Sequence, residues 1–450
     1  MNALSTAILT FFVVVVLFAP RRWALLGMMA SVLYLTQYQQ IKLGGFNMFT
    51  HRFIELAAFI RVVARRELSF TKLNRIDWGL LVLYAYTTVV FLFREEKNVT
   101  YIIGEAVDAY LCYFAFRCLV ANIDEFRWFL KAFVFLLAPY MLLLIREHSA
   151  GHSMFTGLGA LPELASRDDG SVRCCGSFRY ASLMGTLGAS FLPIYIGLSF
   201  NRSDRRLAWV GIAFSAGIVW LSNSGGPLNA AAIALVAWLL WPLRTKMRLV
   251  RWAIVVWIAV AAMVMKAPVW YLIAKVSDLT GGDGWHRSYL IDVSFRHLNL
   301  WWLAGMKDEL TADWFPYVVP TTGSADITNA YISFGLTAGL MSMFLFIALL
   351  TFAFSQLGKA LAAVRAASSE ATSTEFMLWG LGAMLTAHVA TWFGVTYWDQ
   401  TYVLWFMQLA VISNLSQPGL NPIKVPTEET DTSNSQISSH QSVAGATCAI

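Results

Sequence analysis

The stretch ITNAYISFGLTAGLMSMFLFIALL, residues 327–350, contains no Asp, Glu, Lys or Arg. A run of about 20 apolar residues wound as a helix spans the roughly 30 Å hydrocarbon core of a bilayer. Similar apolar blocks recur along the chain, and hydrophobic residues make up 58% of its 450 residues while charged residues make up 13%. Soluble proteins do not have this balance. The sequence therefore predicts an all-α, polytopic integral membrane protein.

About thirteen apolar blocks are candidate transmembrane helices. Lipid offers no hydrogen-bond partner to an open backbone group, so each block is predicted to be helical. The blocks are Ala3–Ala19, Trp23–Thr36, Phe46–Val63, Ile76–Phe93, Tyr101–Val120, Phe129–Ile145, Tyr180–Phe200, Leu207–Leu221, Leu228–Trp241, Trp252–Met265, Asn329–Phe354, Phe376–Phe393 and Tyr402–Leu415. The second block is short. Either all blocks cross and the N-terminus lies outside, or about twelve cross and both termini are cytoplasmic.

Lysine and arginine in every second connection orient the chain, because positive segments are retained in the cytoplasm. These basic connections hold Lys72 and Arg75, residues 201–206, residues 243–251, and Lys359 with Arg365. The intervening connections then face outward, and two of them are long, about 147–178 and 269–328. We expect one transmembrane domain over residues 1–415. Residues 416–450, rich in Ser, Thr and Gln, are predicted to be a disordered cytoplasmic tail.

The two long outward connections carry positive charge, against the topology bias. The first holds His148, His152, Arg167, Arg173 and Arg179, and the second holds His286, Arg287, Arg296, His297 and Lys307. An anionic ligand would explain these cations. A diphosphate is the natural candidate, because guanidinium groups make permanent, bidentate contacts to phosphate oxygens. The alternative is that the arginines bind lipid headgroups or pair with aspartates of the same loops.

Other features favour neither metal nor nucleic acid as a partner. His148 and His152 are four residues apart, but no third ligand follows at zinc-like spacing. The net charge of +6 mostly reflects the basic connections that orient the chain, so it does not indicate a nucleic-acid partner. We expect no metal and no cofactor.

Three segments, in order along the chain, resemble the O-antigen ligase and polymerase superfamily, whose members handle undecaprenyl-diphosphate-linked sugars. The first is RCCGSFRYASLMGTLGASFLPIYIGL, residues 173–198, in which arginine, glycine, a small residue and phenylalanine lead into a helix. The second joins the serine-rich turn SNSGG, residues 222–226, to DGWHRSYLIDVSFRHLNLWWLAGM, residues 283–306. The third is the stretch 327–350, and the resemblance covers about residues 147–415.

The chain departs from the family pattern at two positions. Gly225 stands where many members carry arginine, and Thr328 stands where the ligases carry histidine. The second departure favours a polymerase over a ligase.

The resemblance implies a GT-C-like fold with helical segments in the long periplasmic loop. It also implies a metal-independent glycosyltransferase that polymerises undecaprenyl-diphosphate-linked repeat units into exopolysaccharide or O-antigen at the periplasmic face of the bacterial inner membrane. The departing diphosphate needs fixed cations, and the acceptor hydroxyl needs a base. Two candidate bases and five substrate-binding residues follow: His286 and Asp326, then Arg173, Arg179, Arg287, Asn329 and Tyr331.

Several alternatives remain open. Within the enzyme class, a ligase would transfer the glycan to lipid A core. A glycolipid transporter or flippase would use ionisable residues inside the spans, which could line a polar path or only fix helix packing: Glu55, Glu105, Asp108 and His388. A non-catalytic scaffold would tolerate loss of the arginines. Expected partners are the lipid-linked glycans, membrane lipids, and glycan export or chain-length proteins. Trp301, Trp302 and Trp314 in the long loop could stack on sugar rings.

Overall fold

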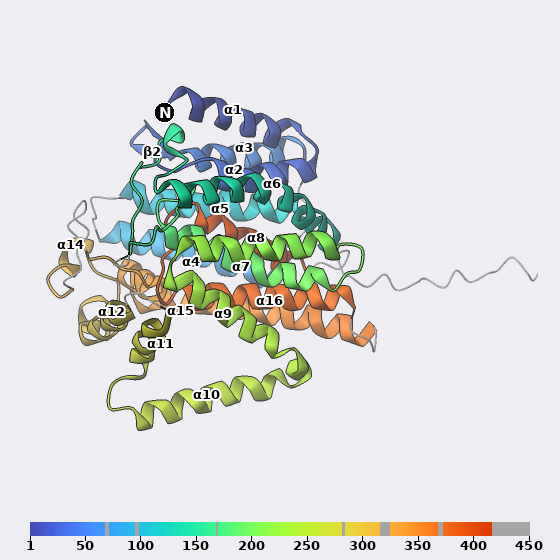
Figure 1. The fold of residues 1–450 in the computed structure, drawn as a ribbon. Helices are drawn as coiled ribbons and strands as arrows, with labels where there is room; N and C mark the ends of the chain where they lie inside the picture. The colour runs from blue at the N-terminus through green and yellow to red at the C-terminus, as the bar shows by residue number, and fades with distance from the viewer. Residues whose placement is uncertain are drawn as a thin grey trace, which may run out of the picture.

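The computed structural model describes residues 1–67, 72–94, 99–167, 170–280, 284–315, 325–367 and 372–415. Over these residues the chain forms a bundle of helices that run side by side, with one small sheet (Figure 1). The helices are α1 (Ala3–Phe18), α2 (Arg21–Tyr34), α3 (Thr50–Ala64), α4 (Arg75–Phe93), α5 (Val99–Leu119), α6 (Ile123–Ala150), α7 (Ala181–Ser199), α8 (Arg205–Ser222), α9 (Gly225–Leu239), α10 (Met247–Val264), α11 (Leu272–Thr280), α12 (Gly284–Arg296), α13 (Leu298–Trp301), α14 (Asp308–Thr311), α15 (Ala330–Ala367), α16 (Ser373–Thr391) and α17 (Thr401–Asn414). The predicted tail, residues 416–450, lies outside the described residues.

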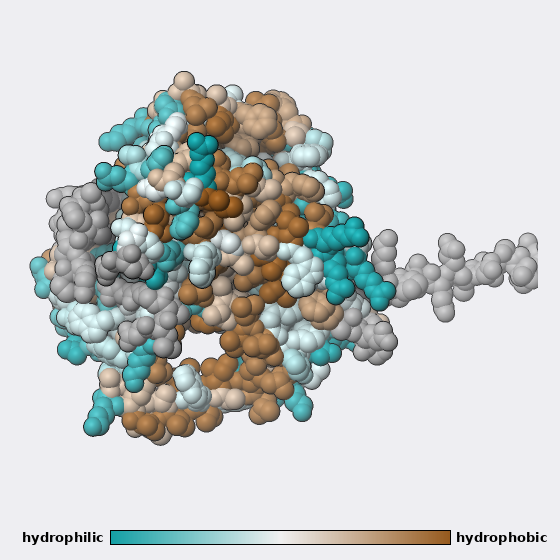
Figure 2. All heavy atoms as spheres, in the orientation of Figure 1, coloured by the Kyte–Doolittle hydropathy of each residue, from teal (hydrophilic) through white to brown (hydrophobic). Residues whose placement is uncertain are grey.

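Every predicted apolar block overlaps a helix, as expected of a mostly helical membrane protein. Among the described residues, 6 helices are long and apolar enough to cross a membrane: α4, α5, α6, α7, α15, and α10 taken together with the 3-10 turn η2 (Trp241–Lys246). Hydrophobic side chains cover the flank of the bundle, and hydrophilic ones gather toward its two ends (Figure 2). The full number of spans stays a prediction.

The predicted helix beginning at Phe46 is wrong in its first turn. Residues 46–49 form strand β2 (Phe46–Phe49), which pairs antiparallel with β1 (Gln40–Leu43), and α3 begins only at Thr50. The turn between the strands is Gly44-Gly45, and both glycines have positive φ, 57° and 86°. Paired glycines supply the backbone geometry of a two-residue hairpin turn. Local turn chemistry therefore overrode the apolar pattern here.

Hydrogen bonds between connecting segments show which of these segments lie together at each end of the bundle. At one end, which we call the loop end, Asn2 Nδ2 donates to the Gly157 carbonyl oxygen (2.8 Å) and Thr36 Oγ1 donates to that of Leu158 (2.7 Å). At the other, which we call the basic end, Asn74 Nδ2 donates to the Ser413 carbonyl oxygen (3.0 Å).

Helix α2 therefore leads from the basic end to the loop end. Arg21, its first residue, donates from Nε to the Leu119 carbonyl oxygen at the basic end (3.0 Å), while Thr36, just beyond its last residue, lies at the loop end. The N-terminus shares the loop end with the long connection that contains Gly157 (Figure 1).

Helix α15 is broken near its start, and the long connection before it docks in the break. Gly339 has φ 83°, so the helical hydrogen bonds are interrupted there. The freed groups bond to the loop: Met306 N donates to the Leu336 carbonyl oxygen, and Leu340 N donates to that of Trp302, both at 2.8 Å. These bonds fix the loop that carries α12 and α13 against the bundle.

Trp301 anchors the same loop and is not available to a sugar. Its side chain is 1% exposed, and its indole Nε1 donates to the Ser294 carbonyl oxygen (2.9 Å). The ring lies on Gly335, where an added Cβ would come within 2.6 Å of Cζ3. The expectation that Trp301 stacks on a sugar is therefore wrong, because the docked loop encloses the ring.

Helix α10 stands apart from the other helices (Figure 1). None of its residues is buried, although it is made largely of Val, Ile, Ala and Trp. The space-filling view shows a gap between it and the bundle (Figure 2). Its apolar side chains therefore lie largely exposed in the described structure.

Replacing Trp301 by Ala should destabilise the folded protein by about 3–5 kcal/mol, because it leaves a large cavity beneath the docked loop. Thermal unfolding in lipid nanodiscs, followed by aggregation, measures the effect. Trp302→Ala is the matched control, because that ring is 53% exposed and its loss should change stability little. Equal midpoints for the two variants would contradict the anchoring role.

Candidate functional site

The site begins with a buried carboxylate that holds a backbone turn. Glu147, near the end of α6, is fully buried, and its Oε1 accepts hydrogen bonds from the backbone N–H groups of Cys175 (2.7 Å) and Gly176 (2.9 Å). Its Oε2 accepts from the N–H of Met154 (3.2 Å). Hydrogen bonds to a carboxylate are stronger than neutral ones. Glu147 therefore fixes the turn that follows Arg173.

Arg173 extends from this turn to the start of α9. Its Nη2 donates to Ser224 Oγ (3.3 Å), while its Nε is buried and has no hydrogen-bond partner among the described residues. No carboxylate of the described chain pairs with it, and burial together with the nearby charge of Arg167 lowers its pKa, partly offset by Cys175. Such an unsatisfied buried donor is costly unless a ligand completes it.

Arg167 lies beside the same connection. Its Nε donates to the Asn223 carbonyl oxygen, one residue before Ser224 (3.1 Å). Arg167 and Arg173, both from the loop 151–180, thus bond to adjacent residues of the connection between α8 and α9.

Arg287, on α12, reaches the same helix start from the other side. An added Cβ on Gly226 would lie 3.8 Å from its Nη2, and one on Gly394 would lie 2.8 Å from its Nε. The side chain is therefore held between the first turn of α9 and the connection after α16. The structure brings the predicted pair Arg173 and Arg287 to one turn of one helix, although they are far apart in sequence.

The first turn of α9 adds a positive electrostatic contribution of its own. Ser224 occupies the N-cap position, but its side chain caps no backbone N–H, and Gly225 and Gly226 follow it. The first N–H groups of a helix have no partner within the helix, and they mark the positive end of its dipole. A helix start of this kind beside fixed guanidinium groups suits an anion such as phosphate.

The two candidate bases are neighbours. Burial raises the pKa of Asp326, and the nearby His286 partly lowers it again. The His286 ring is 7% exposed and stacks on Phe315, with ring centroids 5.0 Å apart. His286 directly precedes Arg287 on α12, so a candidate base and a candidate diphosphate-binding cation lie on adjacent residues of one helix.

Asn329 lies beside the connection after α16, whereas Tyr331 and Arg179 are engaged elsewhere. Asn329 Nδ2 donates to the Phe393 carbonyl oxygen (3.3 Å), next to Gly394. Tyr331 donates its hydroxyl to the Val389 carbonyl oxygen within α16 (3.0 Å). No described contact brings either Tyr331 or Arg179 to the start of α9.

Arg179 is held by a different group of residues. Its Nη2 donates to the Gln37 carbonyl oxygen (2.7 Å), and its guanidinium lies over the rings of Tyr38 and Trp398, at 5.3 and 5.6 Å. Its backbone N–H donates to Oδ2 of the fully buried Asp399 (2.8 Å), whose pKa burial raises. Arg179 thus ties the loop 151–180 to the connection between α16 and α17.

That connection, residues 392–400, is the part of the site that sequence reasoning missed. It contacts Arg287 through Gly394, Asn329 through Phe393, and the segment around Asp326 through Thr396, whose Oγ1 donates to the Ile327 carbonyl oxygen (2.9 Å). Its sequence, WFGVTYWDQ, is short and carries no motif of the family. The one available signal was a glycine and an aspartate among aromatic residues between two predicted spans.

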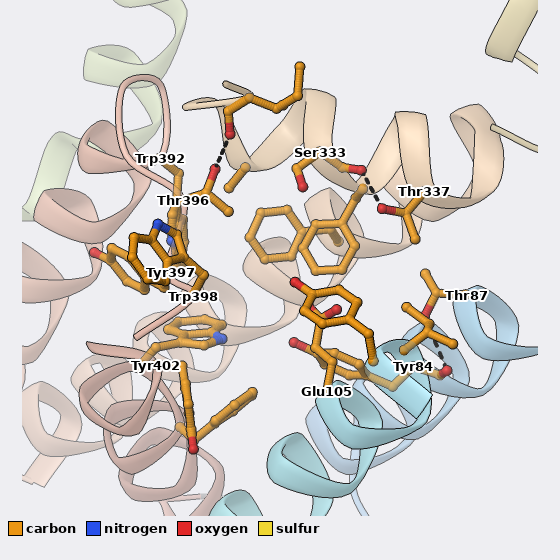
Figure 3. A pocket seen from close by; sticks show the side chains of 18 of the residues that line it. Tyr84, Thr87, Glu105, Ser333, Thr337, Trp392, Thr396, Tyr397, Trp398 and Tyr402 are labelled. Atoms are coloured by element: carbon orange, nitrogen blue, oxygen red, sulfur yellow. Dashed lines mark hydrogen bonds between the residues drawn. The ribbon is translucent and has the colours of Figure 1, made fainter. Parts of the chain in front are cut away.

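A cavity of about 230 Å³ opens on the other side of this connection (Figure 3). It lies between α4, α5, α15 and α17, and the segment around Asp326 closes one side. Aromatic and hydroxyl-bearing side chains dominate its lining, together with one carboxylate, Glu105. The residues that Figure 3 labels are Tyr84, Thr87, Glu105, Ser333, Thr337, Trp392, Thr396, Tyr397, Trp398 and Tyr402.

The other ionisable residues inside the spans mainly join helices to one another. The carboxylate of Asp108 on α5 accepts hydrogen bonds from both Nε and Nη2 of Arg52 on α3 (2.7 Å each). Glu55 accepts the Tyr402 hydroxyl (2.8 Å), and His388 Nδ1 lies 2.6 Å from the Tyr397 hydroxyl. Glu105 differs, because it lines the cavity. These contacts favour helix packing over a continuous polar path for all but Glu105.

The described residues contain no group of three or more His, Cys, Asp or Glu side chains that could hold a metal ion. Comparison of the chain with family models, with curated proteins and with solved structures found no match to any of them.

Glu147→Gln should speed alkylation of Cys175 by about tenfold or more. Removing the Glu147 charge lowers the pKa of the thiol, and each unit by which that pKa falls raises the fraction of reactive thiolate about tenfold. Burial and, next, the Glu147 charge raise the pKa of Cys175 to about 12, so the native thiol should react slowly. The measurement is the rate of maleimide labelling in a background lacking the other cysteines, Cys112, Cys118, Cys174 and Cys448. Glu163→Gln is the control, since Glu163 is an exposed residue of the same loop. Unchanged labelling in Glu147→Gln would show that the Glu147 charge does not suppress ionisation of the Cys175 thiol.

Proposed function

We propose that this protein is a membrane glycosyltransferase that transfers a glycan from a polyprenyl diphosphate to a sugar hydroxyl. The observation that carries the proposal is the position of Arg173 and Arg287 at the uncapped start of α9. Guanidinium groups from two different loops, with a helix N-terminus between them, form a site for a diphosphate that needs no metal. The resemblance to the O-antigen ligase and polymerase superfamily supports the same chemistry.

In the proposed reaction, the acceptor hydroxyl oxygen attacks the anomeric carbon of the donor sugar. The bond from that carbon to the diphosphate oxygen breaks, and the electron pair leaves with the polyprenyl diphosphate. Arg173 and Arg287 stabilise the negative charge that grows on the leaving group, because they are fixed before the reaction begins. The products are the lengthened glycan and free polyprenyl diphosphate.

Asp326 accepts the proton of the acceptor hydroxyl in this scheme. Burial raises the pKa of Asp326, which makes it a stronger base than an exposed carboxylate. His286 lies close enough to lower that pKa, and in this scheme it stabilises the carboxylate.

We favour polymerisation of repeat units, for exopolysaccharide or O-antigen, at the periplasmic face of the bacterial inner membrane. Thr328 in place of the ligase histidine is the sequence feature that supports a polymerase over a ligase. The transporter alternative has weaker support, because most ionisable residues inside the helices pair between helices.

Replacing Arg287 by Ala should lower the transfer rate about 100-fold, as expected for loss of one preorganised donor to a developing anion. Arg287→Lys should lower the rate about tenfold, because an ammonium group cannot make the bidentate contact. Polymer length in cells and transfer in nanodiscs from a lipid-linked donor are the measurements. Long polymer in both variants would refute the role of Arg287.

Gly394→Ala tests the position of Arg287 without changing its charge. The added Cβ would lie 2.8 Å from Nε, so the guanidinium must move, and transfer should fall about tenfold while stability changes little. Gly382→Ala is the matched control, since nothing lies within 4 Å of its added Cβ. A Gly394→Ala protein as active as the control would contradict the proposed placement.

The transfer rate should rise with pH as Asp326 loses its proton, since only the carboxylate accepts a proton. Burial raises the pKa of Asp326, so this rising limb of the pH–rate profile should lie at higher pH than the titration of an exposed aspartate. Asp326→Asn should remove the limb and nearly all activity, whereas His286→Gln should leave the limb and shift it to higher pH. A limb that persists in Asp326→Asn would assign the base elsewhere.

A further inference from the structure

The cavity beside the connection 392–400 has two unlike walls (Figure 3). Trp392, Tyr397 and Trp398 form one wall, together with Tyr402 at the start of α17. Across from them lie side chains of α4, α5 and α15, with oxygen atoms directed at the same space. A sugar ring has this division too, since its C–H face is apolar and its edge carries hydroxyl groups.

Three polar groups on the second wall have no hydrogen-bond partner among the described residues. They are the Tyr84 hydroxyl, the Glu105 carboxyl group and the Ser333 hydroxyl, and they come from α4, α5 and α15. The threonine hydroxyls of the cavity are already used. Those of Thr87 and Thr337 donate within their own helices, and that of Thr396 donates to the Ile327 carbonyl oxygen.

A carboxylate inside a predicted span is costly without a partner, so it indicates a functional site by default. Glu105 makes no ion pair in the described structure, whereas Asp108, one turn along α5, is fully paired with Arg52. Three open polar groups converging from three helices on an aromatic surface are typical of a small-ligand site.

We propose that this cavity binds one pyranose ring of the acceptor glycan. The ring stacks on Trp398 and its aromatic neighbours, and its hydroxyl groups donate to Glu105 and bond to Tyr84 and Ser333. The volume of about 230 Å³ is below the roughly 300–1,000 Å³ of drug-sized ligand sites, so the cavity holds a single ring.

The place of the cavity matches this role, which rests on the proposed transferase function. Ala325 and Ile327 line it, and Asp326 lies between them. Thr396 lines it too, while Gly394, two residues earlier, contacts Arg287. An acceptor ring in the cavity would thus lie across one short segment from the diphosphate site, with the candidate base at the border.

The test uses full-length protein in lipid nanodiscs, free of sugar-based detergents. Saturation-transfer NMR with glucose, galactose and N-acetylglucosamine as probes measures sugar binding, and titration with undecaprenyl diphosphate measures the donor site. At least one sugar should give a saturable signal with the native protein. That signal should fall at least fivefold in Glu105→Gln and in Trp398→Ala, and it should largely return in Trp398→Phe.

Matched controls separate the cavity from general damage. Trp302→Ala removes an indole of similar exposure, 53% against 42% for Trp398, from outside the cavity, and Asp124→Asn removes an exposed carboxylate. Both should keep the native sugar signal. All five cavity and control variants should bind undecaprenyl diphosphate within twofold of the native protein.

The outcomes distinguish this proposal from the proposed function. If no probe saturates, or if Glu105→Gln and Trp398→Ala bind sugar like the native protein, the acceptor site is overturned. If Arg287→Ala binds undecaprenyl diphosphate as tightly as the native protein does, the diphosphate site fails instead, whatever the sugar signal shows.

Discussion

The docking of residues 301–306 into the break of α15 is the contact on which the arrangement of the loop end depends. Two backbone hydrogen bonds, to the Leu336 carbonyl oxygen and from Leu340 N, use groups that an unbroken helix would keep for itself. Gly339 permits the break, and Gly335 leaves room for the indole of Trp301. With the loop fixed there, α12 places Arg287 between the first turn of α9 and the connection after α16, and it places His286 near Asp326.

The second support of the site is independent of the first. Glu147 holds the turn at Cys175 and Gly176 from the end of α6, so Arg173 reaches α9 from one loop while Arg287 reaches it from the other. Each guanidinium is oriented by its own scaffold. Rigid placement of charges from separate elements is what lets a site stabilise an anion without reorganising during the reaction.

The sequence allowed the helices to be located, because crossing lipid demands long apolar runs. Arg173 and Arg287 were singled out by the family resemblance, together with positive charge in connections predicted to face outward. The hairpin at Gly44-Gly45 was missed because its apolar second strand reads as the start of a helix. The role of residues 392–400 could not be foreseen, since it comes from backbone contacts such as that of Gly394. Tyr331, by contrast, turned out to bond within the bundle, which its position beside Asn329 did not indicate.

The length of the helices around the site has a consequence for the surrounding lipid. Helix α9 has 15 residues and α17 has 14, so at about 1.5 Å per residue they rise only about 21–23 Å. Helix α17 is enclosed by the bundle, whereas α9 exposes Leu228, Leu235 and Leu239, so a bilayer with a hydrocarbon thickness of about 30 Å would become thinner next to α9, at a modest elastic cost. Such a local dimple would lower the plane of the phospholipid headgroups toward the start of α9. A lipid-borne phosphate would then meet the guanidinium groups without being lifted out of its leaflet.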